Sequence, residues 1–222
     1  MSAASRKKSS KKDLRAEIED GYWHYLLTEG RQPTSVYALT EQLGVSEGEF
    51  YKVASSFQAL EASYWDRLVE ETIAVLHDDP EYAGYPADQK LLAFFFTFIS
   101  HAQQNRSRLV EFFPALGARC SSLKLMRLRF IQFARELVNQ SVEEGTIADR
   151  KKISDYYPEL LFEQFRAIVE FHRKDGSADF QDTDAFIEKT VRLGTDVARA
   201  GAFESAFDLG RFLLRRFAVP GK

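Results

Sequence analysis

The sequence predicts an all-α fold of about nine or ten helices, on three observations. Apolar residues recur with a helical period over long stretches, and no stretch alternates apolar and polar residues as a strand would. Glycine and proline interrupt this pattern at intervals that suit helices of ordinary length. Residues 1–60 hold one long helix and two short ones joined by a tight turn, which is the order of a helix-turn-helix unit.

The helices of this unit can be assigned in order. A first helix is expected over 13–28, because its apolar residues share one face and a segment with glycine and proline follows it. Ser35 or Thr34 then caps a short helix over 36–43. We therefore expect two helices before the tight turn.

The turn itself carries the clearest local signals. Gly44 suits the left-handed position that closes a helix. Ser46 and Glu49 have the spacing of a capping box, so the third helix begins at this serine. The serine pair before Phe57 caps a long connecting helix over 57–76.

The remainder of the chain continues as helices after a loop at 78–86, which is rich in proline, glycine and aspartate. This organisation predicts a basic arm over 1–12, a helix-turn-helix domain over 13–60 and a helical body over 61–222. Helices of the body are expected over 87–104, 107–113, 122–144, 157–173, 183–200 and 203–216.

Composition argues against several classes of protein. The chain has 222 residues and a single cysteine, Cys120, so it cannot be a disulfide scaffold. Its longest apolar run, 91–99, is far shorter than the ~18 to 20 residues that span a bilayer, and no signal peptide is evident, so we expect a cytoplasmic protein. The four histidines are not at metal-ligand spacing, and no catalytic constellation is present, so we expect no enzyme, no metal and no cofactor.

Charge is unevenly distributed along the chain. The arm over 1–12 holds five basic residues and no acid, so the total of −3 leaves −8 for the rest. A basic arm on an acidic body favours contact with a polyanion, although a solubilising tail has the same composition. Residues 1–60 hold eight bases and eight acids, so the head is neutral only because of the arm.

Aromatic residues are unusually frequent, with 19 Phe and 9 Tyr. They favour either a Phe-rich core or an apolar cavity that holds a small apolar ligand. The candidate lining residues are Phe94, Phe95, Phe98, His101, Phe112, Phe113, Phe130, Phe133, Phe162, Phe165 and His172.

The turn region resembles the TetR family of transcriptional regulators. The resemblance is carried by Thr34-Ser35-Val36, Leu43-Gly44-Val45-Ser46, Gly48, Tyr51 and Ser56 followed by Ala59-Leu60. It implies a homodimer whose helical body is a ligand-binding and dimerisation domain, and whose heads bind operator DNA until a ligand moves them apart. The DNA-binding residues would be Arg6, Lys7, Lys8, Lys11, Lys12, Thr34, Ser35, Tyr37, Ser46, Glu47, Glu49, Tyr51, Lys52 and Ser56.

The presumed recognition helix departs from the family pattern in its charge. Glu47 and Glu49 stand where the family usually has Lys and Thr, and Phe57 replaces a phosphate-contacting Lys. A glutamate repels phosphate, although it can accept a hydrogen bond from the amino group of cytosine. The sequence therefore leaves open a TetR-like fold that no longer reads DNA.

The carboxyl-terminal segment admits two interpretations. By resemblance, 183–200 and 203–217 of two subunits form a four-helix dimer interface. Alternatively, 203–217 is an amphipathic helix at a membrane surface, as in a lipid- or isoprenoid-binding accessory protein of TetR fold that does not bind DNA. The candidate interface residues are Gly194, Ala198, Gly201, Phe203, Ala206, Phe207, Gly210, Leu213, Leu214 and Phe217.

Overall fold

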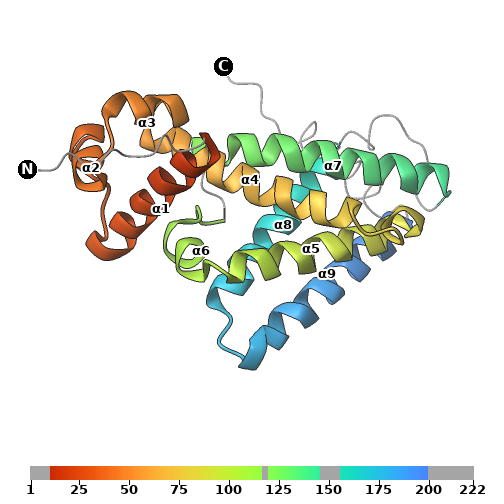
Figure 1. The fold of residues 1–222 in the computed structure, drawn as a ribbon. Helices are drawn as coiled ribbons and strands as arrows, with labels where there is room; N and C mark the ends of the chain where they lie inside the picture. Colours follow the sequence, from red (N-terminus) through yellow and green to blue (C-terminus); the bar gives the residue numbers. More distant parts are fainter. Residues whose placement is uncertain (1–10, 117–119, 146–155, 200–222) are drawn as a thin grey trace, which may run out of the picture. The chain divides into compact units, whose positions relative to one another are not determined.

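The computed structural model describes residues 11–116, 120–145 and 156–199, and these residues fold into nine α-helices and three short 3-10 helices without a strand (Figure 1). The all-α prediction is confirmed, and most of the expected bounds agree within two residues. The α-helices are α1 Lys11–Glu29, α2 Val36–Leu43, α3 Glu47–Val53, α4 Phe57–His77, α5 Ala87–Gln103, α6 Arg106–Phe112, α7 Lys124–Glu143, α8 Tyr157–Lys174 and α9 Gln181–Arg199. The 3-10 helices are η1 Tyr82–Gly84, η2 Ser121–Leu123 and η3 Ala178–Phe180.

The chain forms two compact units. The head unit comprises Met1–Leu68 and Ala102–Met126, and the body unit comprises Val69–His101 and Arg127–Lys222. The head unit therefore holds α6 and the part of α4 up to Leu68 in addition to the three helices expected from the sequence. None of the helices that the structure describes is long and apolar enough to cross a membrane.

The head unit is built on the buried face of α1. Ile18, Tyr22 and Trp23 are fully buried, together with Leu39 of α2 and Phe50 of α3. In Figure 1, α1, α2 and α3 form one cluster at the amino-terminal end of the colour scale. Burial of such large side chains is the main favourable contribution to folding of a small helical unit.

The body unit is built around phenylalanine and the pair α8 and α9. Phe94, Phe98 and Phe165 have no exposed surface. Helices α8 and α9 pack against each other, with the rings of Phe171 and Phe186 stacked at 4.3 Å between centroids. The segment before α9 is held by Asp175, whose carboxylate accepts hydrogen bonds from the Thr183 amide at 2.8 Å and from the Thr183 hydroxyl at 2.6 Å.

Candidate nucleic-acid interface and ligand pocket

The tight turn has the geometry that the sequence predicts. Ser35 caps α2, accepting a hydrogen bond at 3.0 Å from the amide of Ala38. Gly44 closes α2 in the left-handed conformation, with a φ of 66°, where a side chain would be strained. Both halves of the capping box of α3 are formed: the Ser46 hydroxyl accepts from the Glu49 amide at 3.2 Å, and the Glu49 carboxylate accepts from the Ser46 amide at 2.8 Å.

The predicted DNA-binding serines therefore have a structural task as well. Ser56 caps α4 in the same way, accepting from the amide of Ala59 at 3.1 Å. Ser35, Ser46 and Ser56 thus each use a hydroxyl oxygen to satisfy a free amide at the start of a helix. The hydroxyls of Ser35 and Ser56 can still donate their own proton to a phosphate. The Ser46 hydroxyl instead donates its proton to the Glu49 carboxylate at 2.8 Å.

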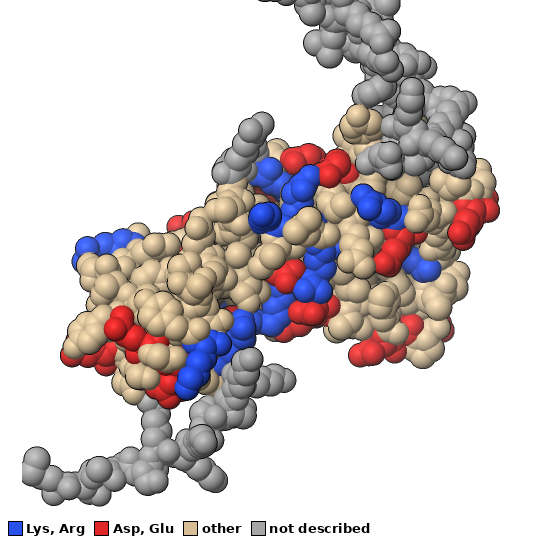
Figure 2. All heavy atoms as spheres, turned by 90° about the horizontal axis from the view of Figure 1, so that it is seen from above, with Lys and Arg blue, Asp and Glu red and all other residues tan. Residues whose placement is uncertain are grey.

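Other predicted contact residues lie on the outer side of α2 and α3. The rings of Tyr37 and Tyr51 are 58% and 56% exposed, and Glu47 and Lys52 are also exposed. Figure 2 shows acidic as well as basic spheres on the surface of the head unit. This surface is therefore aromatic and of mixed charge rather than uniformly basic.

The remaining predicted contacts belong to the start of the chain. Thr34 is exposed, next to the N-cap residue of α2. Lys11 and Lys12 form the first turn of α1. Arg6, Lys7 and Lys8 lie outside the described residues.

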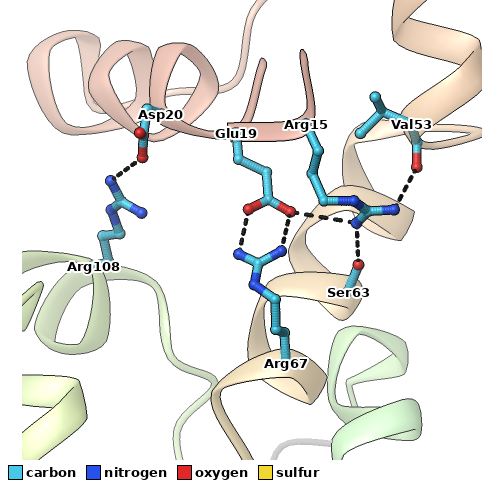
Figure 3. Close-up of polar contacts among 7 residues, drawn as sticks. All are labelled: Arg15, Glu19, Asp20, Val53, Ser63, Arg67 and Arg108. Atoms are coloured by element: carbon cyan, nitrogen blue, oxygen red, sulfur yellow. Dashed lines mark hydrogen bonds and ion pairs between the residues drawn. The ribbon is translucent and has the colours of Figure 1, made fainter. Parts of the chain in front are cut away.

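A polar network fixes the helices of the head unit to one another (Figure 3). The Glu19 carboxylate, almost fully buried, accepts hydrogen bonds from both terminal nitrogens of Arg67 on α4. Arg15 donates to the Ser63 hydroxyl at 2.7 Å and to the Val53 carbonyl at 3.4 Å. Since Val53 is the last residue of α3, this contact ties the end of that helix to α1.

A second contact attaches α6 to the head unit. Arg108 makes an ion pair with Asp20 at 2.9 Å, as Figure 3 shows. Its guanidinium group also lies over the rings of Trp23, at 5.8 Å, and Tyr64, at 5.3 Å. Cation–π contacts of this kind add to the attraction of the ion pair.

The predicted aromatic lining does not form one cavity. The rings of Phe112 and Phe113 contact Trp23 and Trp65 in the head unit, at 5.9 and 5.1 Å between centroids. In the body unit, by contrast, seven of the predicted rings pack against one another at distances such as 4.6 Å between Phe98 and Phe165. These are Phe94, Phe95, Phe98, Phe130, Phe133, Phe162 and Phe165.

Both histidines of the predicted lining have hydroxyl neighbours. His101 Nδ1 lies 3.3 Å from the Thr72 hydroxyl, and His172 Nδ1 lies 3.3 Å from the Thr183 hydroxyl. His172 is fully buried and its ring meets that of Phe180 at 4.9 Å. The structure thus gives these histidines partners within the protein. Among the described residues, no group of three or more potential ligands could hold a metal ion.

A pocket of about 450 Å³ lies elsewhere in the body unit, a volume that falls within the range typical of small-molecule sites. Its walls come from the beginning of α5, the end of α7, the first half of α8 and the second half of α9. Leu91, Leu137, Leu161 and Val191 are typical of this mostly apolar lining. None of the predicted aromatic residues lines it, because their rings fill the core instead.

Residues of the predicted dimer interface divide between the pocket and the end of the chain. Gly194 and Ala198 line the pocket from α9. Gly201, Phe203, Ala206, Phe207, Gly210, Leu213, Leu214 and Phe217 lie outside the described residues.

Sequence reasoning missed Gln164, a polar residue in the wall of the pocket. The only signal was its position, because it stands on the stripe of α8 that Tyr157, Leu161 and Ile168 otherwise make apolar. It also missed Gly21, where a side chain would collide with Leu43 of α2 at 2.4 Å. That close approach depends on how two helices pack, so the sequence of either helix alone does not predict it.

Comparison with known proteins agrees with this architecture. Residues 90–213 match the family model described as the tetracyclin repressor-like C-terminal domain, which covers more than half of the chain. The fold is similar to the crystal structure of a protein from Syntrophomonas wolfei strain Goettingen that is assigned to the TetR family of transcriptional regulators. The TM-score is 0.64 at 13% identity, over 85% of this chain and 96% of that one. No curated protein matches the sequence significantly.

Proposed function

Because this chain belongs to the TetR family of transcriptional regulators, we propose that it is a homodimeric repressor in the cytoplasm. In this proposal α2 and α3 bind operator DNA, and a small apolar ligand in the body unit releases it. Membership of this family also indicates that the protein is a regulator and not an enzyme.

The geometry of the turn carries the DNA-binding part of the proposal. Gly44 and the Ser46–Glu49 capping box hold α2 and α3 at a fixed angle, and Arg15 fixes the far end of α3 through the Val53 carbonyl. A second helix held rigidly on a scaffold, with its outer side exposed, is what entry into the major groove requires. Tyr37, Tyr51 and Lys52 are then the side chains that reach the duplex.

Binding of the full-length protein to duplex DNA across a salt series tests this function. The logarithm of the association constant is expected to fall linearly with the logarithm of salt concentration. Lys52→Gln is expected to weaken binding and reduce the slope by ~0.9 if this lysine touches a phosphate. Lys189→Gln, the same change at an exposed position of α9, is the matched control and is expected to leave binding unchanged.

Lack of binding to any duplex at low salt would overturn the proposal. It would favour the lipid-binding alternative. The amphipathic segment 203–217, on which that alternative depends, lies outside the described residues. No contact in the described residues favours that alternative.

The dimer part of the proposal rests on membership of the TetR family, since the resemblance implies a homodimer. Sedimentation equilibrium is expected to give twice the chain mass, and a monomer at micromolar concentration would contradict this part.

A further inference from the structure

A strip of apolar side chains lies open along α8 and α9 of the body unit and includes part of the pocket wall. Leu160 and Leu193, which line the pocket, are 45% and 63% exposed. Farther along the two helices, the half-buried rings of Phe171 and Phe186 stack on each other. Apolar side chains grouped in this way mark a surface that another apolar element covers. We call this surface the α8–α9 strip; its members, at helical spacing and all at least partly exposed, are Leu160, Ala167 and Phe171 of α8 and Phe186, Leu193 and Val197 of α9.

The chain leaves α9 beside this strip. Val197, Ala198 and Arg199 all line the pocket, so residues 200–222 begin at its wall. An extended chain spans roughly 14 Å between residues 199 and 203. The segment 203–217 therefore starts next to the pocket of its own chain, and it reaches the same strip on a second copy only if the two strips meet.

The sequence of 203–217 predicts an amphipathic helix that matches the strip. Phe203, Phe207 and Leu214 fall on one apolar face, and the charged residues fall on the other. A helix of this length extends roughly 22 Å, whereas the part of α9 from Phe186 onward extends roughly 20 Å. Segment and strip therefore have nearly the same length when the segment folds back along α9.

Charge favours the same direction. Residues 209–217 hold three arginines and no acid, and they lie toward the start of α9 when the segment runs antiparallel to that helix. There Asp182, Asp184 and Glu188 are exposed, and Lys189 is the one base in the first half of α9. Partial burial and the charges of two nearby carboxylates raise the pKa of Asp184. A cationic segment would relieve the repulsion among these acids.

We infer that residues 203–217 dock on the α8–α9 strip of their own chain, antiparallel to α9, and close the pocket. Phe207 then covers the pocket, and Leu214 covers the stacked rings of Phe171 and Phe186. A small apolar ligand gains access only when the segment leaves. The segment therefore competes with the ligand of the proposed function, and this consequence alone rests on that function.

Cross-linking of the full-length protein tests docking. Cys120 is the single native cysteine and is exposed, so Cys120→Ser provides the background. Leu160→Cys on the strip is combined with Ala206→Cys on the segment, and a short bis-maleimide is added. Because docking holds these two thiols together, a cross-link within one chain is expected to form about tenfold faster than in the control pair. Intact-mass spectrometry identifies the product.

The control pair is Leu128→Cys with Ala206→Cys in the same background. Leu128 lies on α7, is 54% exposed and belongs neither to the strip nor to the pocket wall. Rates are compared after correction for the reactivity of each single cysteine. If Leu160→Cys does not fold, Glu163→Cys, at an exposed position one turn along α8, replaces it.

Binding of the neutral apolar dye Nile red, without DNA, tests closure of the pocket. Only molecules with an open pocket bind the dye, so its apparent affinity falls as the closed fraction rises. Phe207→Ala removes the ring that covers the pocket and is expected to bind the dye at least about fivefold more tightly than the wild type does. Glu204→Ala, on the charged face of the segment, is the matched control and is expected to bind the dye as the wild type does.

Three results would overturn the inference. Equal cross-linking rates at Leu160 and Leu128 would show that the segment is not docked. A cross-link that joins two chains would show that the strip holds the segment of a second copy. Equal dye binding by Phe207→Ala and the wild type would show that the segment does not close the pocket. Because neither measurement contains DNA, failure here and failure of the proposed regulator can be told apart.

Discussion

Glu19 of α1 and Arg67 of α4 form a two-pronged ion pair in which the carboxylate is almost entirely buried (Figure 3). Arg15 approaches the same carboxylate at 3.5 Å and continues to the end of α3. The pair therefore connects the long helix α4 to the helix that supports the turn. A buried charge of this kind is tolerated only while its partners remain in place.

Arg67→Ala is expected to lower the free energy of unfolding by about 2 kcal/mol, because among the described residues it leaves Arg15 as the one ion-pair partner of the buried Glu19 charge. This figure is below the full penalty for a buried pair, since Arg67 is 30% exposed. Urea unfolding measures it. Arg192→Ala, which removes an arginine 86% exposed and 4.0 Å from Asp196, is the control and is expected to cost less than about 0.5 kcal/mol. Equal losses in both variants would contradict the importance of the buried pair.

Two helical glycines are expected to respond oppositely to replacement by alanine. A Cβ at Gly21 would meet Leu43 at 2.4 Å, so Gly21→Ala is expected to destabilise the protein by about 1 kcal/mol, the cost of overpacking less the gain in helix propensity. A Cβ at Gly48 would have its nearest neighbour, the Ser46 hydroxyl, at 3.9 Å. Gly48→Ala is therefore expected to stabilise by about 0.5 to 1 kcal/mol. Thermal unfolding of both variants measures these changes in stability. An increase in stability in Gly21→Ala would show that the Leu43 side chain moves aside freely.

Phe165 tests whether the aromatic cluster is core or ligand-binding surface. Its ring has no exposed surface and contacts Phe98, Phe130 and Phe94. Phe165→Ala is expected to cost about 3 to 5 kcal/mol of unfolding free energy, as for a large core side chain. A variant of near wild-type stability that loses ligand affinity would instead favour the lining predicted from the sequence.

The two glutamates of α3 are expected to differ when each is changed to glutamine. In the proposed complex with DNA, both changes remove a negative charge that faces the duplex, so both are expected to raise non-specific DNA affinity, by up to about tenfold at low salt. Glu47→Gln removes only this charge, whereas Glu49→Gln also weakens the cap on the Ser46 amide. Thermal unfolding is therefore expected to separate them, with Glu49→Gln losing more stability than Glu47→Gln, which loses only the attraction of a first-turn charge to the helix dipole. Unchanged DNA affinity in both would indicate that this side of α3 does not face the duplex.

Asp175 predicts an acid-dependent contribution to stability. The hydrogen bond from the Thr183 hydroxyl, with further bonds from the Ser177 and Thr183 amides, holds the pKa of Asp175 well below its ordinary value of 3.8, despite the opposing effect of burial. A lowered pKa in the folded state means that the carboxylate stabilises the fold above pH 3.8 and that this stabilisation is lost as pH falls through the folded-state pKa.

Asp175→Asn is therefore expected to reduce stability at neutral pH and to flatten its decline in acid, measured by urea unfolding at a series of pH values. Asp182→Asn, at an exposed carboxylate in the first turn of α9, is the control. If the free energy of unfolding of Asp175→Asn fell as steeply in acid as that of the wild type, other groups would be responsible for the decline.

Most of the fold follows from the sequence because its signals are local. Gly44, Ser46 and Glu49 specify the turn through their own backbone and side-chain chemistry, so no distant residue is needed to predict it. Apolar periodicity gave the helices of the body in the same way. The capping roles of Ser35 and Ser56 were likewise readable from residue type and position.

The location of the pocket could not be predicted, because it depends on how helices pack. Phe94 and Phe165 are as compatible with a lined cavity as with a solid core until their rings are seen in contact, at 5.5 Å between centroids. The pocket forms instead where leucine, valine and glycine leave space among the ends of α5, α7, α8 and α9. Periodicity identifies a buried face but not the volume that its side chains fill.

The exposed rings of Tyr37 and Tyr51 have a thermodynamic consequence for an operator-binding head. Recognition that depends on lysine and arginine is driven by the release of counterions. Two tyrosines that leave water on docking would instead make the heat capacity of association strongly negative. The temperature dependence of the binding enthalpy would then distinguish this regulator from one with a basic head. The head would also keep its affinity for DNA at salt concentrations at which a basic head dissociates.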